Sequence, residues 1–511
     1  MDPQFDEWGP FGRPLFNDPA TRALARVGVV DVGSNSVRLV VFDGAARSPA
    51  YFYNEKIMCG LGAGLPETGN LNPKGRIRAL AAIRRFQLLA EDMGIPPLTA
   101  VATAAVRDAD DGPDFCADVL RETGLELYVI DGAEEARLTS QGVLLGWPTA
   151  KGLVCDIGGS SMELAEVSDG QVGRCITSPL GPLKLSNIKG GKKGLKNHIN
   201  AILDQMFSQI PVEKQRLFLV GGSWRAIAKL DMLRRNYPLT VLHEYRMTPR
   251  SVMQTVKWIN EHDLDDLQKR SGISTSRIVL IHTACEILKR VVRKFKPREI
   301  AISAYGIREG MLYEQMPQQL RDRDPLIEAC RYAEDKDARW PGFGRKLYKF
   351  IIPLFKGAND DRKRLIRATC LLHDVTWRAH PDYRAEVCFD NATRANLGGL
   401  RHRERVFLGL ALLHRYKNGR NGTRFEPLVE LLDEKDAQQA EVVGKAIRFG
   451  AMLTMDAIND LADLRYYPKK KQLELRLGEK ARGLFGEVAE ARFMSLAASL
   501  ETEVQILNLR K

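Results

Sequence analysis

Two segments of this chain repeat one another at a constant offset, and the repeat limits the fold more than any other feature. They are residues 29–39 and 154–164. In each segment an apolar strand ends at an aspartate (Asp31 or Asp156), glycine and serine follow, and a second apolar strand begins. That order predicts a β-hairpin whose turn lets another group approach closely. Two unrelated hairpins with glycine turns are the alternative, but the matched positions favour a duplicated lobe.

Helical and strand patterns alternate after each hairpin. Apolar spacing predicts helices over residues 72–94, 114–123, 134–145 and 224–233, and strands over residues 98–103, 125–130 and 217–220. Such alternation is typical of an α/β fold, here with two similar lobes and a cleft between them.

The composition of the turns indicates a ligand chemistry. Small residues let backbone N–H groups and hydroxyls converge on phosphate oxygens. An aspartate fixed at a strand end can hold Mg²⁺ directly or through water. The hairpins therefore predict phosphate and Mg²⁺ binding.

Composition narrows the class of protein. The 511 residues favour two to four domains, and the net charge of +12 indicates either a solvated basic surface or a polyanionic partner. Nucleic acid is not expected, because zinc-finger, basic-zipper and RNA-recognition motifs are missing. The eight cysteines form no CxxC pair, which favours a reducing cytoplasm. The polar, acidic N-terminal segment is not expected to be a signal peptide, and the apolar stretches are too short to cross a membrane.

Seven motifs occur in a fixed order over roughly residues 29–312. They read DVGSNSVRL, ATAAVRDA, DGAEEARL, DIGGSSMELAEV, SPLGPLKL, FLVGGS and YGIREGML. In combination they resemble the exopolyphosphatase/guanosine pentaphosphate phosphohydrolase family, a branch of the acetate kinase–heat-shock ATPase–actin superfamily. The resemblance implies duplicated actin-like, ribonuclease H-like α/β lobes followed by a mainly helical HD-like C-terminal region.

The resemblance also implies roles for matched residues. Arg107 would bind substrate phosphate, Glu135 would be the general base that activates water, and Glu163 would act in catalysis and metal binding. Asp31, Asp156 and Glu163 would hold Mg²⁺, or Mn²⁺ in its place, and a need for K⁺ stays open. The phosphate-binding loops would comprise Gly33, Ser34, Asn35, Gly158, Gly159, Ser160, Ser161, Gly221 and Gly222.

Several of these positions have a plainer interpretation or depart from the family pattern. Glu135 could be an exposed glutamate that the helix dipole stabilises, and Glu134 beside it should face another direction. The second loop reads GGSS where the family usually has GGGS, so that Ser160 replaces a glycine. In the third loop, the bulk of Trp224 and Arg225 argues against a nucleotide pocket and favours polyphosphate. Arg225 by itself is expected to be a structural helix residue.

Two basic segments could be either solvated surface or functional. Five lysines surround Gly190 and Gly191 (Lys184, Lys189, Lys192, Lys193 and Lys196), either as a solvated loop or as a guide for a polyanion. Residues 289–298 are expected to form the solvated basic face of an amphipathic helix.

The C-terminal third holds a His-Asp pair, His373-Asp374, after an apolar helix. His380, His402 and His414 are available as further ligands, but their spacing identifies no metal site. A degenerate helical domain without metal is the favoured interpretation, with dimerisation and clamping of a long substrate as its uses.

The predicted organisation has five parts: an N-terminal tail (1–24), actin-like lobes I (25–145) and II (146–318), a helical HD-like domain (319–465) and a small terminal module (466–511). The predicted function is exopolyphosphatase activity in a cytoplasmic homodimer, with inorganic polyphosphate as substrate and with neither nucleic acid nor membrane as partner. Hydrolysis of guanosine pentaphosphate is the nearest alternative, and guanosine penta- or tetraphosphate a further ligand. An actin-like ATPase or kinase and a non-catalytic alarmone-binding regulator are less favoured.

Overall fold

The computed structural model describes residues 26–43, 47–48, 50–95, 98–211, 215–314, 316, 318–419 and 422–509. The chain forms two compact units, of which the first ends at Arg323 and the second begins at Asp324. The predicted N-terminal tail, residues 1–24, lies outside the described residues. Within the described ranges, no helix is long and apolar enough to span a membrane.

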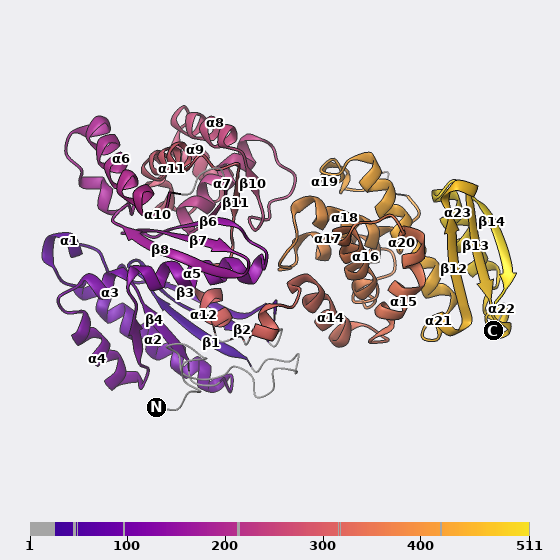
Figure 1. The fold of residues 1–511 in the computed structure, drawn as a ribbon. Coiled ribbons are helices and arrows are strands. Elements are labelled where there is room, and N and C mark those ends of the chain that lie inside the picture. The colour runs from indigo at the N-terminus through magenta and orange to yellow at the C-terminus, as the bar shows by residue number, and fades with distance from the viewer. Residues whose placement is uncertain are drawn as a thin grey trace. The chain divides into compact units, whose positions relative to one another are not determined.

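The first unit contains two sheets built to one plan (Figure 1). One has the strand order β3-β2-β1-β4-β5 and the other the order β10-β11-β9-β6-β7-β8. In each, two consecutive antiparallel hairpins lie beside strands that pair in parallel. The strands of the first sheet are β1 (Val27–Val32), β2 (Ser36–Phe42), β3 (Tyr51–Met58), β4 (Thr99–Ala102) and β5 (Leu127–Val129). Those of the second are β6 (Gly152–Ile157), β7 (Met162–Ser168), β8 (Gln171–Ser178), β9 (Arg216–Val220), β10 (Arg246–Met247) and β11 (Glu299–Ile302).

Helices connect and cover these strands. They are α1 (Leu65–Thr68), α2 (Pro73–Asp92), α3 (Ala104–Asp108), α4 (Gly112–Thr123), α5 (Gly132–Gly146), α6 (Gly191–Gln209), α7 (Gly222–Arg234), α8 (Pro249–Asn260), α9 (Leu264–Ser271), α10 (Thr275–Ile278), α11 (Ile281–Phe295), α12 (Ile307–Glu314) and α13 (Gln318–Arg321), with a 3₁₀ turn, η2 (Lys184–Asn187). The start of α2 shows how local sequence determines where a helix begins. Asn72 caps the helix by accepting from Gly75 N (2.9 Å), and Pro73 occupies its first turn. The basic helix expected to reach residue 298 ends earlier, at Phe295, because Lys296 adopts a left-handed conformation (φ 45°).

The two lobes share one core through α5 and α12. Apolar residues of both sheets, such as Val29 and Val154, pack with residues of these helices in a continuous cluster. The helices cross so closely that a Cβ atom on Gly310 would lie 1.7 Å from the Leu138 main-chain oxygen, which only glycine avoids. The duplicated α/β lobes are therefore one packed body, and α5 runs along the junction.

The second unit is mainly helical and ends in a three-stranded sheet of order β12-β13-β14. Its helices are α14 (Pro325–Asp337), α15 (Phe343–Ile351), α16 (Asp360–Leu372), α17 (Arg384–Arg394), α18 (His402–His414), α19 (Glu426–Val429), α20 (Glu434–Leu453), α21 (Ile458–Leu461), α22 (Glu479–Leu484) and α23 (Glu487–Ser499), with 3₁₀ turns η3 (Ile352–Phe355) and η4 (Pro468–Lys470). The strands are β12 (Ala462–Tyr467), β13 (Gln472–Leu477) and β14 (Glu503–Asn508). The predicted fold class, duplicated α/β lobes followed by a mainly helical region, is confirmed.

Candidate functional site

The two repeated hairpins have the same turn. Gly33 N donates to Ser36 O at 3.1 Å in the first, and Gly158 N donates to Ser161 O at 3.0 Å in the second. Strand register then places Asp31 opposite Arg38, and Asp156 opposite Glu163. The duplication therefore brings an acid–base pair to one turn and a pair of acids to the other.

The first turn of α5 carries Glu135 toward the second hairpin. Asp131 caps the helix by accepting from Glu134 N at 2.7 Å. Gly132 lies so close to β8 that a Cβ atom there would be 2.6 Å from Thr177, whose hydroxyl donates to Glu163 at 3.1 Å. This close approach places Glu135 beside Glu163.

Burial and mutual repulsion raise the pKa values of three of these carboxyl groups. Burial, followed by the charges of Glu163 and Asp156, raises the pKa of Glu135 well above its ordinary value. Burial and the nearby Asp156 raise the pKa of Glu163 to about 8, against hydrogen bonds from the hydroxyls of Ser161 and Thr177. Burial also raises the pKa of Asp156, although Thr139 donates to it at 2.9 Å. Raised carboxyl pKa values in one place are typical of functional sites.

Two glutamates at the start of α5 have different partners. Glu134 is bound by Arg137 at 2.7 Å, and Arg137 also binds Glu314 at 2.8 Å. Glu135 is largely buried, with 14% of its side chain exposed, and its Oε2 has no hydrogen-bond partner among the described residues. Glu135 is thus the one of the two that lies with the acidic group around Asp156.

Arg107 lies next to Glu135. Its Nη1 is 3.6 Å from Glu135 Oε2 and donates to the main-chain oxygen of Ile130 at 3.0 Å. Its Nε donates to Asp108 at 3.3 Å, and Asp108 also pairs with Lys184 at 3.4 Å. Arg107 is therefore anchored, with 23% of its side chain exposed for a further contact.

The third glycine loop presses against the second hairpin. Gly221 has φ +109°, and a Cβ atom there would lie 2.5 Å from the Ile157 main-chain oxygen and 2.9 Å from Asp156 Oδ1. Glycine is needed at this position for both reasons. A Cβ atom on Gly222 would lie 2.8 Å from the guanidinium of Arg277.

The remaining loop residues lie on these turns. Ser34 O accepts from Gly62 N at 2.8 Å, and Asn35 O accepts from Cys59 N and Gly60 N at 3.0 Å each. In the second turn, Gly159 O accepts from Leu183 N at 2.9 Å. Asn35 and Gly158 are exposed and Ser161 is buried. The residues Gly33, Ser34, Gly159 and Ser160 are partly buried.

Five cations gather around the first hairpin, and the sequence alone did not reveal them as a group. This cationic cluster comprises Arg38 on β2, Lys56 on β3, Arg225 on α7, Arg277 on α10 and Arg308 on α12. Burial and the neighbouring Arg308 lower the pKa of Arg38 to about 10. Burial and nearby arginines likewise lower the pKa values of Lys56 and Arg225.

Only part of this positive charge is neutralised. Arg308 Nη1 binds Asp31 at 2.8 Å, so that the aspartate of the first hairpin is already held by a cation. Arg225 Nε is buried without a hydrogen-bond partner among the described residues. The excess positive charge indicates an anionic ligand.

The structure changes the interpretation of Trp224 in the third loop and shows the surroundings of Arg225. Trp224 is fully buried in the core of lobe II, so its bulk fills no ligand site and does not argue against a nucleotide. Arg225, expected to be a structural helix residue, is buried within electrostatic range of Arg308 and Asp156.

Two members of the cationic cluster could have been identified from the sequence. Arg38 occupies the position in the first repeat that Glu163 occupies in the second, and Arg308 lies in the motif YGIREGML. Lys56 and Arg277 lie in no such motif or repeat.

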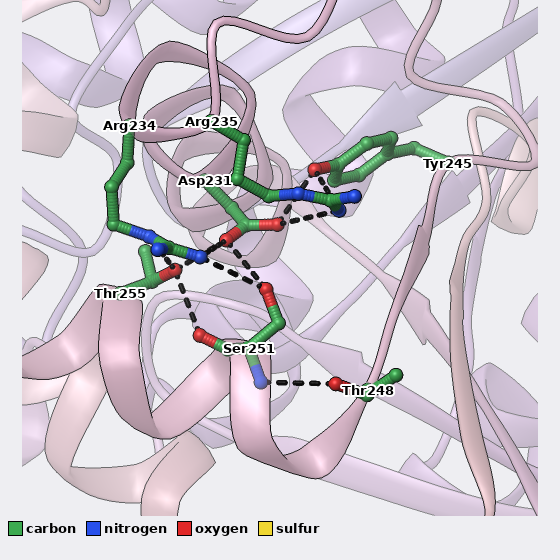
Figure 2. Close-up of polar contacts among 7 residues, drawn as sticks. All are labelled: Asp231, Arg234, Arg235, Tyr245, Thr248, Ser251 and Thr255. Carbon is green, nitrogen blue, oxygen red and sulfur yellow. Dashed lines mark hydrogen bonds and ion pairs between the residues drawn. The ribbon is translucent and has the colours of Figure 1, made fainter. Parts of the chain in front are cut away.

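A buried polar network fixes α7, which carries the third loop, against α8 (Figure 2). Asp231 accepts hydrogen bonds from Arg234 (2.8 Å), Tyr245 (2.6 Å), Ser251 (2.8 Å) and Thr255 (2.5 Å). Burial alone would raise the pKa of Asp231, but these hydrogen bonds hold it below its ordinary value. With its charge fully compensated, Asp231 is a structural anchor.

Other predicted residues lie away from this site. Lys189, Lys192, Lys193 and Lys196 are exposed at the start of α6 and just before it. In the second unit, His373 Nδ1 lies 2.7 Å from Cys370 O and Asp374 is bound by Arg339 at 2.6 Å. His402 and His414 are buried, and His380 is exposed. Among the described residues, no group of three His, Cys, Asp or Glu side chains is arranged to hold one metal ion.

Comparisons with known proteins agree with this architecture. Exopolyphosphatase 1 of Mycobacterium tuberculosis is 26% identical over 317 residues, which are 60% of this chain and 92% of that protein. Retrograde regulation protein 2 of Saccharomyces cerevisiae is 25% identical over 452 residues, covering 78% of this chain and 74% of that protein.

Solved structures share the fold over more than half of this chain. A Ppx/GppA protein from Aquifex aeolicus matches with a TM-score of 0.50 and 24% identity, over 58% of this chain and 99% of that one. An exopolyphosphatase from Cytophaga hutchinsonii matches with a TM-score of 0.51 and 21% identity, over 57% of this chain and 97% of that one.

Family models cover most of the sequence. The model described as "Exopolyphosphatase, C-terminal" matches residues 344–506. The model of the Ppx/GppA phosphatase family matches residues 40–319, more than half of the chain. The chain therefore belongs to the Ppx/GppA phosphatase family.

Proposed function

We propose that this protein is an exopolyphosphatase, which hydrolyses the terminal phosphoanhydride bond of inorganic polyphosphate and releases orthophosphate. The observation that carries the proposal is the position of Glu135. It is a largely buried carboxylate beside Arg107, within electrostatic range of Glu163 and Asp156 of the second hairpin and of Asp31 of the first. The names of the mycobacterial and Cytophaga relatives support this substrate.

The reaction needs a water molecule in line with the terminal phosphorus, a proton acceptor and positive charge on the phosphoryl oxygens. In our proposal Glu135 orients the water and accepts its proton while the water oxygen bonds to phosphorus and the bridging P–O bond breaks. Its raised pKa makes the ionised carboxylate a stronger base. Arg107 and the N–H groups of the turns hold the phosphate oxygens.

A divalent ion is part of the proposal, Mg²⁺ or in its place Mn²⁺. Asp156 and Glu163 lie opposite each other in register, and Glu163 Oε2 is buried without a hydrogen-bond partner among the described residues. Mg²⁺ commonly takes one or two carboxylates and completes its shell with water and phosphate, so this pair fits it. When bound, the ion would neutralise charge on the phosphoryl oxygens. Asp31 is less suited, because Arg308 already binds it.

The cationic cluster supports a long polyanion as the substrate. Arg38, Lys56, Arg225 and Arg277 outnumber the carboxylates near them, and a phosphate chain carries charge along its whole length. Guanosine pentaphosphate presents the same phosphate chemistry at one end and is the second candidate, which the resemblance of the sequence motifs implies.

The proposed setting is a cytoplasmic homodimer. All eight cysteines are free, as expected in a reducing compartment. The dimer rests on the family resemblance, and light scattering of the purified protein would measure its mass.

Phosphate release distinguishes the substrates. The full-length protein would be given long-chain polyphosphate, guanosine pentaphosphate and ATP separately, each with Mg²⁺ and with a chelator in place of the ion. We expect the highest kcat/KM on polyphosphate and no turnover with the chelator. Turnover of ATP alone would refute the proposal, and a preference for guanosine pentaphosphate would select the second candidate.

A further inference from the structure

An arginine in the second unit is buried without a counter-charge. Arg415 follows α18 and is 7% exposed. Its Nε is buried without an acceptor, and within the described part of the chain its guanidinium has no hydrogen bond or ion pair. An unpaired buried charge costs several kcal/mol, so a protein seldom keeps one unless something else compensates it.

A second guanidinium lies on the same aromatic ring. The Cζ atoms of Arg415 and Arg384 are 4.7 Å and 5.6 Å from the ring centroid of Tyr416. Arg384 donates from Nη2 to Ala379 O at 3.2 Å, but its Nε is also buried without an acceptor among the described residues. The ring stabilises the two cations only partly, because a cation–π contact is weaker than an ion pair with a desolvated anion.

The carboxylate within electrostatic range of Arg415 is already engaged. Asp374 is 2% exposed and accepts from Arg339 through Nη2 (2.6 Å), Nε (2.9 Å) and the main-chain N (3.1 Å). Its charge is therefore neutralised by Arg339. Two further arginines lie within electrostatic range of Arg415. Besides burial, Arg339 contributes to lowering the pKa of Arg415, and Arg415 contributes to lowering the pKa of Arg448.

We propose that Arg384 and Arg415 form a binding site for a phosphate-type oxyanion in the helical unit. Planar guanidinium groups bind phosphate oxygens in pairs, and an oxyanion would accept from the donors that the protein leaves unpaired. The source is either free orthophosphate or the end of a polyphosphate chain, which present the same oxygens.

Hydrogen exchange of the full-length protein can locate such a site. Exchange would be followed by mass spectrometry in peptides of α17 and of residues 402–419, without anion, with orthophosphate and with tripolyphosphate. In the wild type we expect saturating anion to slow exchange there by about threefold or more. Slowing by orthophosphate would identify the free ion as the ligand, and slowing by tripolyphosphate alone would identify a chain end.

Three variants test the assignment. Arg415→Met and Arg384→Met should abolish the slowing, and Arg424→Met should keep it. Arg424 is a matched control because it pairs with Glu386 and Asp390 on α17 but is exposed. Arg415→Met should also unfold at the same or higher urea concentration than the wild type in anion-free buffer, since it removes an unpaired charge. If Arg415→Met does not fold, Arg384→Met decides. No slowing in the wild type, or equal slowing in a folded Arg415→Met or Arg384→Met variant, would overturn the proposal.

Discussion

The two hairpins differ in charge although they share one backbone. Their turns close with nearly equal hydrogen bonds, and the aspartates Asp31 and Asp156 occupy equivalent strand ends. Across the strand, however, the first hairpin carries Arg38 and the second carries Glu163. A duplicated turn thus fixes where a phosphate can approach, and one side chain beside it decides whether the turn attracts an anion or gathers carboxylates.

The partners of the two aspartates follow the same division. Asp31 is paired with Arg308. Asp156 instead accepts a hydrogen bond from the Thr139 hydroxyl, and, besides burial, its charge helps to raise the pKa of Glu163. We infer that the first hairpin, with the cationic cluster around it, mainly holds the substrate and that the second hairpin, with α5, mainly carries the chemistry. The predictions below test that division.

The largest predicted effect is on kcat and comes from Glu135 in the first turn of α5. Glu135→Gln removes the proton acceptor and should lower kcat on polyphosphate by about 10²–10⁴-fold while leaving substrate binding intact. The matched control is Glu134→Gln, which breaks only the pair with Arg137. Retained turnover in Glu135→Gln would remove this residue from its role.

The second effect concerns stability and pH. The folded protein holds a proton on Glu163 up to about pH 8, whereas the unfolded chain loses it near pH 4.5. Stability of the metal-free protein should therefore fall as pH rises through that window. Glu163→Gln should remove this loss and stabilise the protein by about 2–4 kcal/mol at pH 9, with little change at pH 4.5. Urea denaturation at both pH values measures it.

The equivalent test in lobe I should give the opposite result. Asp31→Asn leaves Arg308 with a weaker partner, so we expect it to destabilise the protein at both pH values. A stabilisation like that of Glu163→Gln would show that the two turns are electrostatically alike.

A smaller effect should separate binding from chemistry. Arg38→Met should raise KM for long-chain polyphosphate about tenfold, the equivalent of about 1.4 kcal/mol, with kcat nearly unchanged. Arg174→Met, an exposed arginine paired with Glu166, is the control. A fall in kcat without a change in KM would place Arg38 in the chemistry instead.

The smallest effect should come from one hydroxyl. Thr139→Val removes the hydrogen bond to Asp156, raises the pKa of that carboxyl further and should lower kcat about 3- to 10-fold near neutral pH. The loss should shrink as pH rises, because Asp156 then ionises without help. Thr123→Val, which removes a hydroxyl bonded to Val119 O, should have no such pH-dependent effect.

The sequence predicted what local patterns and the repeat determine. Both hairpins, the start of α5 near Glu135 and the strands that flank them follow from apolar periodicity and small residues in turns. The cationic cluster could not be predicted in the same way, because its members come from five elements that only tertiary packing brings together. Arg308, for example, lies 277 residues from Asp31 in the chain.

The most direct test of the division is the affinity for a short polyphosphate without Mg²⁺ at pH 9, where Glu163 is charged. Isothermal titration would compare the wild type with Arg38→Met and Glu163→Gln. We expect opposite signs: Arg38→Met should weaken binding because it removes attraction, and Glu163→Gln should strengthen it because it removes repulsion. Weaker binding in both variants, or no change in Arg38→Met, would contradict the division of labour between the two hairpins.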